Sequence, residues 1–349
     1  MHTFPVGKIP HSILSGLFTR IPAKDPRVLV GPEIGEDSAV IDMGDHYLVV
    51  KTDPITFATE RIGWYVVHIN ANDVACMGAR PRWMLVTMLL PEGNTDRKLL
   101  ETIFDDLCSA CTALDITLCG GHSEVTYGID RPIVVGQLIG EVDKDKLVRK
   151  ESITPGDVIL LTKGIAIEGT SVLAREQGST LSEKVDQILI ERAKTFLIDP
   201  GISIVKEALA AVSCGHVHGM HDPTEGGLAT GLWELAHRAK TGMHINGDSI
   251  PVLPETKMFC ELLGLDPMGL LASGALLLVV DPGHVSTIQE VIQREGTTCT
   301  TIGEIRESSY GMRIEEGGLV KTLHPFEVDE LARTFAHKNF IKGFSKENM

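Results

Sequence analysis

An apolar run that contains an amide and a carboxylate constrains this chain more than any other feature. From Ile62 to Cys76, hydrophobic residues recur at helical spacing, and Asp73 falls on the stripe that should face the core. Gly78 then suits the C-terminal cap of a helix. Buried polar groups cost free energy unless something binds them. The run predicts a buried helix with a polar site near its end, although Asn72 and Asp73 could instead form an internal cap where the helix breaks and restarts.

Two further carboxylate positions lie at the ends of predicted strands. Glu36 and Asp37 precede a strand expected at residues 39–43, and Asp53 follows the strand expected at residues 47–51. Magnesium prefers hard oxygen ligands and is commonly shared between one or two carboxylates and the phosphates of a substrate. Asp37, Asp53 and Asp73 therefore predict a magnesium site that binds a nucleotide through the metal.

Length and charge limit the possible functions. A chain of 349 residues suggests about two domains, and 43% hydrophobic with 23% charged residues is ordinary for a globular protein. The formal net charge of -15 argues against binding to nucleic acid or to an anionic membrane, both of which need a basic face. The sequence shows neither an apolar span of about 18 residues nor a signal-like start. We expect a cytoplasmic protein.

The seven cysteines are odd in number and lack the spacing of a secreted disulfide framework, which favours a reducing compartment. Cys108 and Cys111 could form a redox pair or part of a metal site. Cys111 lies on the apolar stripe of a predicted helix, however, and buried free cysteine behaves as a small hydrophobe. Core packing is the preferred interpretation.

Strand-like and helix-like runs alternate along the chain, which predicts the α/β (α+β) class. The charged stretch 143–151, followed by Pro155 and Gly156, interrupts the pattern and predicts a boundary between domains at 1–152 and 153–349. Further strands are expected at 83–89, 133–140, 158–162 and 275–280, and helices from residue 97 and at 188–196, 202–212, 228–239 and 285–294.

Two glycine pairs occur in predicted turns beside polar residues. Gly120 and Gly121 precede His122, and a second pair, at residues 226 and 227, follows Asp222 and Glu225 and opens a helix. Paired glycines let backbone amides approach an anion, and a helix start adds unpaired amides and a positive dipole end. Each signal alone is weak, because Gly-Gly most often marks an ordinary turn.

Taken in order, these motifs resemble an ATP-binding superfamily. GEDSAV, TDP, NANDVACMGARP, GGHSEVT, GDVILLTKGIAIEGTSVLA and HDPTEGGL, between Gly35 and Ala275, are similar to motifs of the AIR synthase-related, PurM-like proteins. That superfamily includes aminoimidazole ribonucleotide synthetase, selenophosphate synthetase, thiamine-monophosphate kinase and the hydrogenase-maturation protein HypE. IEGT at 167–170 and LDPMGLLASG at 265–274 make the HypE-like branch the most similar one.

The resemblance implies a two-domain PurM-like fold whose N-terminal mixed sheet forms a barrel in a homodimer, with a C-terminal α/β domain. ATP and Mg2+ would lie in a cleft between domains and subunits. The site residues that the resemblance implies are Asp37, Asp53 and Asp73 for magnesium, Gly35, Asn72, Gly120 and Gly121 for the nucleotide, and Asp222 and Glu225 for catalysis. His122 is a further catalytic candidate, although it departs from the family pattern.

The implied activity is ATP-dependent activation of a carbonyl-type oxygen on a small-molecule or protein-tail acceptor. Three alternatives stay open: an ATP-binding regulatory or maturation protein without turnover, a thiamine-monophosphate kinase-like phosphotransferase, and a zinc hydrolase built on His216, His218 and His221. Lys51 and Lys163 are the basic residues nearest to the predicted phosphates, and each could equally lie on the surface.

Two departures from the family pattern bear on the activity. His122 and Ser123 stand where the family turn reads GGDT, and histidine is a poor magnesium ligand. His122 could act as a general base or simply face solvent. The segment Gly343 to Met349 lacks the terminal cysteine that the HypE resemblance requires, and no cysteine precedes Cys76. Thiocyanate formation on the chain's own terminus is therefore not expected.

Overall fold

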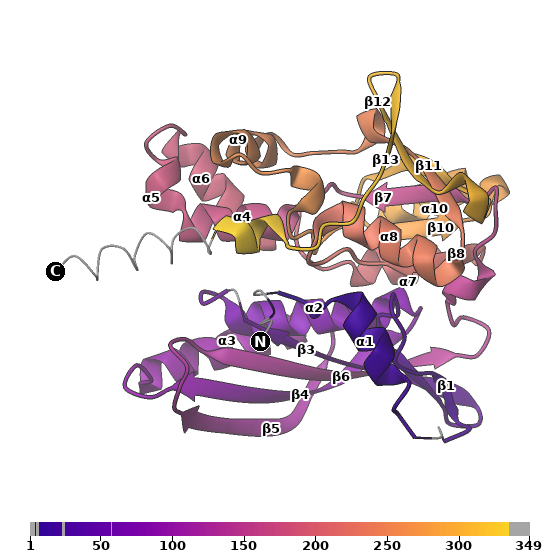
Figure 1. The fold of residues 1–349 in the computed structure, drawn as a ribbon. Helices are drawn as coiled ribbons and strands as arrows, with labels where there is room; N and C mark the ends of the chain where they lie inside the picture. The colour runs from indigo at the N-terminus through magenta and orange to yellow at the C-terminus, as the bar shows by residue number, and fades with distance from the viewer. Residues whose placement is uncertain (1–3, 5–6, 23–24, 57, 335–349) are drawn as a thin grey trace.

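The computed structural model describes residue 4 and residues 7–22, 25–56 and 58–334. Two sheets form the framework, one in each half of the chain (Figure 1). The first sheet is mixed, since β4 and β5 are parallel and its other neighbours antiparallel. Its strand order is β1 (Val28–Val30), β2 (Ala39–Asp42), β3 (His46–Ile55), β6 (Ile133–Asp143), β4 (Arg80–Pro91) and β5 (Thr117–Thr126).

Helices α2 (Ile62–Cys76) and α3 (Arg97–Ala113) lie on one face of this sheet, and α2 separates it from the second half of the molecule (Figure 1). Every residue of α2 except Trp64 is buried. The helix therefore has no single apolar stripe, because both of its sides are covered. It runs without a break through Asn72 and Asp73, so the predicted helix is confirmed and the internal-cap interpretation is wrong.

The second sheet has seven strands, in the order β13 (Leu319–Thr322), β12 (Met312–Glu316), β9 (Gly242–Asn246), β11 (Cys299–Arg306), β7 (Val158–Thr162), β10 (Leu277–Val280) and β8 (Val217–His221). The remaining helices are α1 (His11–Phe18), α4 (Ile167–Glu176), α5 (Gly178–Leu181), α6 (Gln187–Lys194), α7 (Val205–Ser213), α8 (Gly227–Ala239), α9 (Pro254–Leu263) and α10 (Val285–Arg294). Short 3-10 turns occupy Lys150–Ser152, Thr195–Leu197, Gly247–Ser249, Pro267–Gly269, Pro282–His284 and Ser308–Tyr310. The predicted mixed α/β architecture is confirmed.

The structure differs from one predicted element, and the described residues do not include the C-terminal segment. The segment 119–125, predicted as a turn, forms the interior of β5 at the edge of the first sheet. Cys111 is buried and Cys108 exposed, and both are free thiols. We propose the domain boundary at residues 152 and 153, between β6 and β7. The terminal segment Gly343 to Met349 lies outside the described residues.

Within the described part of the chain, no helix is both long and apolar enough to cross a lipid bilayer.

Candidate functional site

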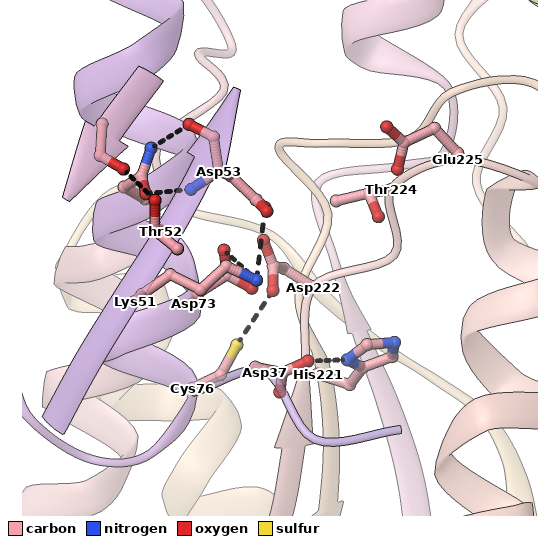
Figure 2. A network of polar contacts seen from close by, with 12 residues as sticks. Asp37, Lys51, Thr52, Asp53, Asp73, Cys76, His221, Asp222, Thr224 and Glu225 are labelled. Atoms are coloured by element: carbon pink, nitrogen blue, oxygen red, sulfur yellow. Dashed lines mark hydrogen bonds and ion pairs between the residues drawn. The ribbon is translucent and has the colours of Figure 1, made fainter. Parts of the chain in front are cut away.

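Four carboxylates from separate elements meet where the two halves of the molecule face each other (Figure 2). Asp37 precedes β2, Asp53 lies on β3, Asp73 on α2, and Asp222 directly follows β8. Asp37, Asp73 and Asp222 are buried, whereas the side chain of Asp53 is 36% exposed. The structure thus brings together the three predicted magnesium ligands and one of the predicted catalytic residues.

Lys51 lies inside this carboxylate cluster. Its Nζ is 3.2 Å from Oδ2 of Asp53 and 3.2 Å from Oδ2 of Asp73. Burial disfavours the ammonium, but the charges of Asp73 and Asp53 outweigh this effect and raise the pKa of Lys51 above its ordinary value. Lys51 is therefore a cation held within the cluster, with a side chain only 18% exposed, rather than a surface lysine.

Asp37 is the centre of a hydrogen-bond network that joins the two halves. His221 Nδ1 lies 2.6 Å from Oδ1, and Lys150 Nζ donates to Oδ2 at 2.8 Å. Burial opposes ionisation, but His221 and Lys150 together hold the pKa of Asp37 well below its usual range. His221 also contacts Oε2 of Glu234 at 2.9 Å through Nε2. Burial lowers the pKa of His221, while Asp37 and these hydrogen bonds outweigh it and raise the pKa to about 9.

Asp222 keeps one carboxylate oxygen free. Its Oδ1 accepts from the thiol of Cys76 at 3.5 Å, and its Oδ2 is buried without a hydrogen-bond partner. Burial and then the charge of Asp37 raise the pKa of Asp222 to about 7. Burial also raises the pKa of Asp73 well above its ordinary value, opposed by Lys51 and reinforced by Asp222. Unpaired or strongly perturbed carboxylates that face one another are typical of binding sites.

This arrangement suits a divalent cation. Magnesium takes oxygen ligands and uses one or two carboxylates together with substrate phosphates. The buried, unpartnered Oδ2 of Asp222 and the convergence of Asp53 and Asp73 provide such oxygens. Asp37 is less available, because both of its oxygens already have cationic partners. Ligand atoms of Asp37, Cys76 and Asp222 lie within 4.8 Å of one another, and Lys51 joins Asp53 and Asp73 to this group.

Asn72 and Gly35 have structural roles that differ from the predicted ones. Asn72 is fully buried, and its Oδ1 accepts from the amide of Ile204 while its Nδ2 donates to the carbonyl of Ile202. The oxygen and the nitrogen of its carboxamide therefore both bind backbone groups of the second half, and the structure does not place Asn72 at an open phosphate site. Gly35 has a φ of +84°, and a Cβ atom there would lie 2.7 Å from the carbonyl oxygen of Glu234. The glycine thus permits close packing on α8.

Gly120, Gly121 and His122 lie apart from the carboxylate cluster within one chain. They belong to β5, which β6 and β4 separate from β3. With neighbouring strands about 4.8 Å apart, β5 lies roughly 14 Å from β3. His122 is exposed, and its Nε2 is 3.0 Å from Oε2 of Glu124. Within one chain, these three residues therefore do not contact the carboxylate cluster, and their predicted approach to the nucleotide would have to come from a partner subunit.

The turn after Asp222 also differs from its prediction. The amide of Gly226 donates to Oδ2 of Asp329 at 2.7 Å, and the amide of Gly227 donates to the carbonyl of Thr224 at 3.1 Å. The start of α8 therefore has no free glycine amides for an anion. Oε2 of Glu225 lies 3.1 Å from Nζ of Lys8, at the side of the site that faces Asp53 (Figure 2).

The three histidines proposed for zinc have separate partners. His216 stacks on His284, His218 contacts Asp157 and His221 contacts Asp37. Among the described residues, the candidate metal-ligand group comprises Asp37, Cys76 and Asp222, without His216 or His218. The predicted zinc site is wrong. Lys163 is likewise buried and paired with Glu207 at 2.8 Å, away from the surface.

Sequence reasoning missed Lys150 and the role of Cys76. Lys150 lies 113 positions from Asp37 and belongs to no motif, so no local signal could have indicated the contact. Cys76 occurs within the NANDVACMGARP motif, only three positions after Asp73, and its spacing does place it near the same end of α2. His221 was considered only as part of the HDPTEGG match and of the zinc alternative.

Comparison with known families decides the classification. Residues 35–142 match the AIR synthase related protein, N-terminal domain, and residues 154–315 match the AIR synthase related protein, C-terminal domain. The chain belongs to the AIR synthase-related family. The predicted PurM-like membership is confirmed.

Several curated relatives of this AIR synthase-related protein have names from hydrogenase expression or maturation. It is 28% identical over 295 residues to a protein of the hydrogenase expression/formation class from Methanocaldococcus jannaschii, covering 82% of this chain and 84% of the relative. It is also 28% identical over 298 residues to the carbamoyl dehydratase HypE of Cupriavidus necator, covering 82% of each chain. These similarities confirm the predicted HypE-like branch.

Solved structures share the fold of this AIR synthase-related protein. HypE in complex with ATP superposes with a TM-score of 0.71 at 24% identity, covering 94% of this chain and 97% of that one. HypE in its complex with HypF gives a TM-score of 0.73 at 19% identity, covering 90% and 99%. A thiamine-monophosphate kinase complexed with AMPPCP and TMP gives 0.68 at 19% identity, covering 90% and 93%.

Proposed function

We propose that this AIR synthase-related protein is an ATP-dependent enzyme that uses Mg-ATP to activate a carbonyl-type oxygen of an acceptor. The observation that carries the proposal is the meeting of Asp53, Asp73 and Asp222 from both halves of the chain, with Oδ2 of Asp222 buried and unpartnered. Relatives named carbamoyl dehydratase HypE, and a HypE neighbour bound to ATP, support this reading.

Each side chain of the cluster has a distinct part in the proposal. Magnesium, held by Asp53, Asp73 and Asp222, would supply positive charge to the triphosphate. Lys51 would add a second positive charge beside the phosphates, where charge accumulates in phosphoryl transfer. The network of Asp37, His221 and Lys150 would hold the two halves in register around the nucleotide.

The proposed reaction needs only ATP and the acceptor as reactants. The carbonyl oxygen of the acceptor attacks the γ-phosphorus, and the bond from that phosphorus to the ADP oxygen breaks. The carbon–oxygen bond of the activated acceptor then breaks, and phosphate leaves with the former carbonyl oxygen. For a primary carboxamide, the two N–H protons leave as the nitrile forms. One stays on the departing hydrogen phosphate and the other passes to solvent, so ATP and the carboxamide give ADP, phosphate, a nitrile and one proton.

We also propose a homodimer in which the edge strand β5 takes part. The strand is solvent-exposed along most of its length, with Val125 58% exposed, and an uncovered strand edge is a ready template for pairing. In such a dimer, Gly120, Gly121 and His122 would approach the site from the partner chain. The cytoplasm stays the expected location, and a protein partner that presents an acceptor is compatible with the HypE–HypF neighbour.

An oxygen-18 experiment tests the proposed chemistry. The intact protein is incubated with Mg-ATP and primary carboxamides labelled with oxygen-18 at the carbonyl, including formamide, benzamide and S-carbamoyl-N-acetylcysteine. We expect ADP together with inorganic phosphate that carries one oxygen-18 atom and a nitrile product. A stable phosphorylated product would favour the kinase alternative. Phosphate carrying only solvent oxygen, or no ADP with any acceptor, would contradict the proposal, and the second result would favour an ATP-binding regulator.

A further inference from the structure

A cysteine thiol lies inside the carboxylate cluster. Cys76 is the last residue of α2, is 1% exposed, and has its Sγ 3.5 Å from Oδ1 of Asp222. The two side chains point toward each other from the two halves of the chain, and Asp37 lies beside them (Figure 2). Among the residues that the structure describes, these three side chains form a compact group of possible metal ligands, with ligand atoms within 4.8 Å of one another.

Asp222 has a carboxylate oxygen without a partner among the described residues. Its Oδ2 is buried without a hydrogen bond, and the residue as a whole is 1% exposed. An unpartnered buried polar atom costs about 1–3 kcal/mol, and more when the group is charged. A bound cation would remove this cost. The free oxygen therefore indicates a ligand independently of how close the three side chains lie.

Asp37 can bind an ion without losing its present partners. Its Oδ1 is 2.6 Å from Nδ1 of His221, and its Oδ2 accepts from Nζ of Lys150 at 2.8 Å. A carboxylate offers about four lone-pair sites, so each oxygen keeps a second one. Carboxylates that bind metals are commonly held by hydrogen bonds of this kind. His221 and Lys150 would therefore orient Asp37 toward the ion.

The basic side chains around the site leave Asp222 without an ion pair. His221 and Lys150 contact Asp37, and Lys51 contacts the two carboxylates of Asp53 and Asp73. Within the described part of the chain, no lysine, arginine or histidine comes within 4.0 Å of the Asp222 carboxylate, according to its ion pairs. A cation at Asp222 would supply the positive charge that the other three carboxylates of the cluster already have.

The thiol determines which ions would bind most tightly. Magnesium takes oxygen ligands, whereas a cysteine thiolate favours zinc and similar transition-metal ions. In a tetrahedral zinc site, bonds of about 2.3 Å to sulfur and about 2.0–2.2 Å to oxygen place these two ligand atoms about 3.5 Å apart. The distance of 3.5 Å from Sγ of Cys76 to Oδ1 of Asp222 already has this value. Metal binding would release the thiol proton to solvent, since the thiolate is the ligand.

We propose that Asp37, Cys76 and Asp222 form a site for a zinc-class transition-metal ion, and that the Cys76 thiolate makes the site prefer such an ion over magnesium. Three protein ligands leave a fourth position for water. The metal site is argued from these side chains alone, whereas its effect on nucleotide binding rests on the proposed function. A bound zinc ion would occupy Asp222, which that function assigns to magnesium, and should weaken the binding of Mg-ATP.

Cobalt(II) chloride is the probe, because a thiolate bound to cobalt gives an intense charge-transfer absorption in the near ultraviolet, which oxygen ligands do not give. It is titrated into the intact protein in the presence of a phosphine reductant and without nucleotide. We expect one cobalt ion per chain to bind with this absorption. An equimolar amount of zinc should abolish the absorption, whereas about a hundredfold excess of magnesium should leave it in place.

Cys76→Ser and Cys260→Ser form a matched pair, because each replaces a buried free thiol by a hydroxyl. Cys76→Ser should remove the absorption and weaken cobalt binding at least about tenfold. Cys260 lies outside the group of three ligands, so Cys260→Ser should keep both the absorption and the affinity. An absorption that is absent from the wild type, that survives in Cys76→Ser, or that is lost equally in Cys260→Ser would overturn the inference.

X-ray absorption spectroscopy of the zinc-loaded wild type tests the same site without a substitution. We expect one sulfur neighbour at about 2.3 Å and oxygen neighbours at about 2.0 Å from the zinc ion. This measurement decides the question even where Cys76→Ser does not fold. A shell of oxygen or nitrogen neighbours without sulfur would overturn the inference.

Binding of a non-hydrolysable ATP analogue with magnesium separates this inference from the proposed function. A wild type that gives the cobalt absorption but binds no analogue would contradict the proposed function and leave the metal site intact. A wild type that binds the analogue without giving the absorption would contradict the inference alone. The zinc-loaded protein should bind the analogue at least about tenfold more weakly than the zinc-free protein. An unchanged affinity would show that zinc does not occupy Asp222 and would overturn the assignment of the ligands.

Discussion

At Asn72, the oxygen and the nitrogen of one carboxamide connect the helix α2 to a segment 130 residues away. The Oδ1 atom accepts from the Ile204 amide at 2.9 Å, and Nδ2 donates to the Ile202 carbonyl at 2.8 Å. This geometry explains why an amide occurs in an otherwise apolar helix: the second half of the chain presents unpaired backbone groups to α2, and Asn72 satisfies them.

Replacing Asn72 with leucine should destabilise the fold. The similar-sized apolar side chain leaves the Ile204 amide and the Ile202 carbonyl unpaired, and each such group costs about 1–3 kcal/mol. We expect the free energy of unfolding to fall by about 2–4 kcal/mol in a denaturant titration. Asn94→Leu, at an exposed position, should change it by less than about 0.5 kcal/mol. An unchanged stability in Asn72→Leu would show that the bridge is not formed.

The burial of His68 predicts that the folded state loses stability at acidic pH. The ring is buried against Trp64, both ring nitrogens lack partners, and burial followed by the charges of Lys163 and Arg61 lowers its pKa to about 3. The unfolded state, with a pKa near 6.5, takes up a proton first as the pH falls. The contribution of His68 to stability is complete above pH 6.5 and is lost progressively from there toward pH 3.

Between pH 7 and pH 5, this one residue should lower the free energy of unfolding by about 2 kcal/mol. His68→Phe should reduce the loss of stability over that interval by a similar amount, whatever its effect at pH 7. The exposed His324→Phe serves as the control and should keep the wild-type pH dependence. Parallel pH profiles for the wild type and His68→Phe would contradict the argument.

Among the helices and strands, the sequence predicted the elements whose own residues form a clear hydrophobic pattern. The strand Val158–Thr162 and the helix Val285–Arg294 have the predicted bounds, because an apolar run defines the first and an amphipathic period the second. Helix α2 was predicted from its hydrophobicity, although its burial on both sides depends on the second half of the chain. Asp73 was predicted as a ligand because it interrupts an apolar helix, and Asp53 because it lies where a strand was expected to end, although β3 continues through it to Ile55.

The strand β5 could not be predicted in the same way. Gly120 and Gly121 indicate a turn when only their neighbours are considered, and their pairing with Leu85 and Val86 of β4 depends on the rest of the sheet. Gly121 also illustrates a tertiary requirement, since a Cβ atom there would collide with the Val86 carbonyl oxygen. Contacts between residues far apart in the sequence, such as Lys150 with Asp37, could not be predicted for the same reason.

The packing of α2 on α3 provides a test at this scale. A Cβ atom on Gly63 would lie 2.4 Å from the carbonyl oxygen of Ile103, whereas one on Gly16 in α1 would meet nothing within 4 Å. Gly63→Ala should therefore lower the free energy of unfolding by about 1–3 kcal/mol through overpacking, despite the better helix propensity of alanine. Gly16→Ala should leave stability unchanged or raise it by up to about 1 kcal/mol. Equal effects of the two substitutions in thermal or denaturant unfolding would refute the close approach of the two helices.

At the scale of the whole molecule, the open edge of the first sheet leads to a prediction about assembly. Sedimentation velocity should show a dimer of the intact chain, and Val125→Lys on β5 should raise its dissociation constant at least tenfold, because charged side chains on an edge oppose strand pairing. Lys98→Glu, on the exposed surface of α3, is a control that should keep the dimer. A monomeric wild type at micromolar concentration would contradict the proposed assembly.

A cluster of carboxylates lies between the two halves of the chain, and the proposed function depends on what that cluster binds. Asp53 and Asp73 come from the first half and Asp222 from the second, so a bound metal nucleotide would join both halves.

Calorimetric titration of ATP into the intact protein tests this central claim most directly. With Mg2+ present, we expect saturable binding that weakens at least tenfold when a chelator replaces the metal. Asp73→Asn should weaken it at least tenfold as well, and the exposed Asp130→Asn should not. Binding that is independent of magnesium, or that is unchanged in Asp73→Asn, would contradict the proposed metal-bridged ATP site.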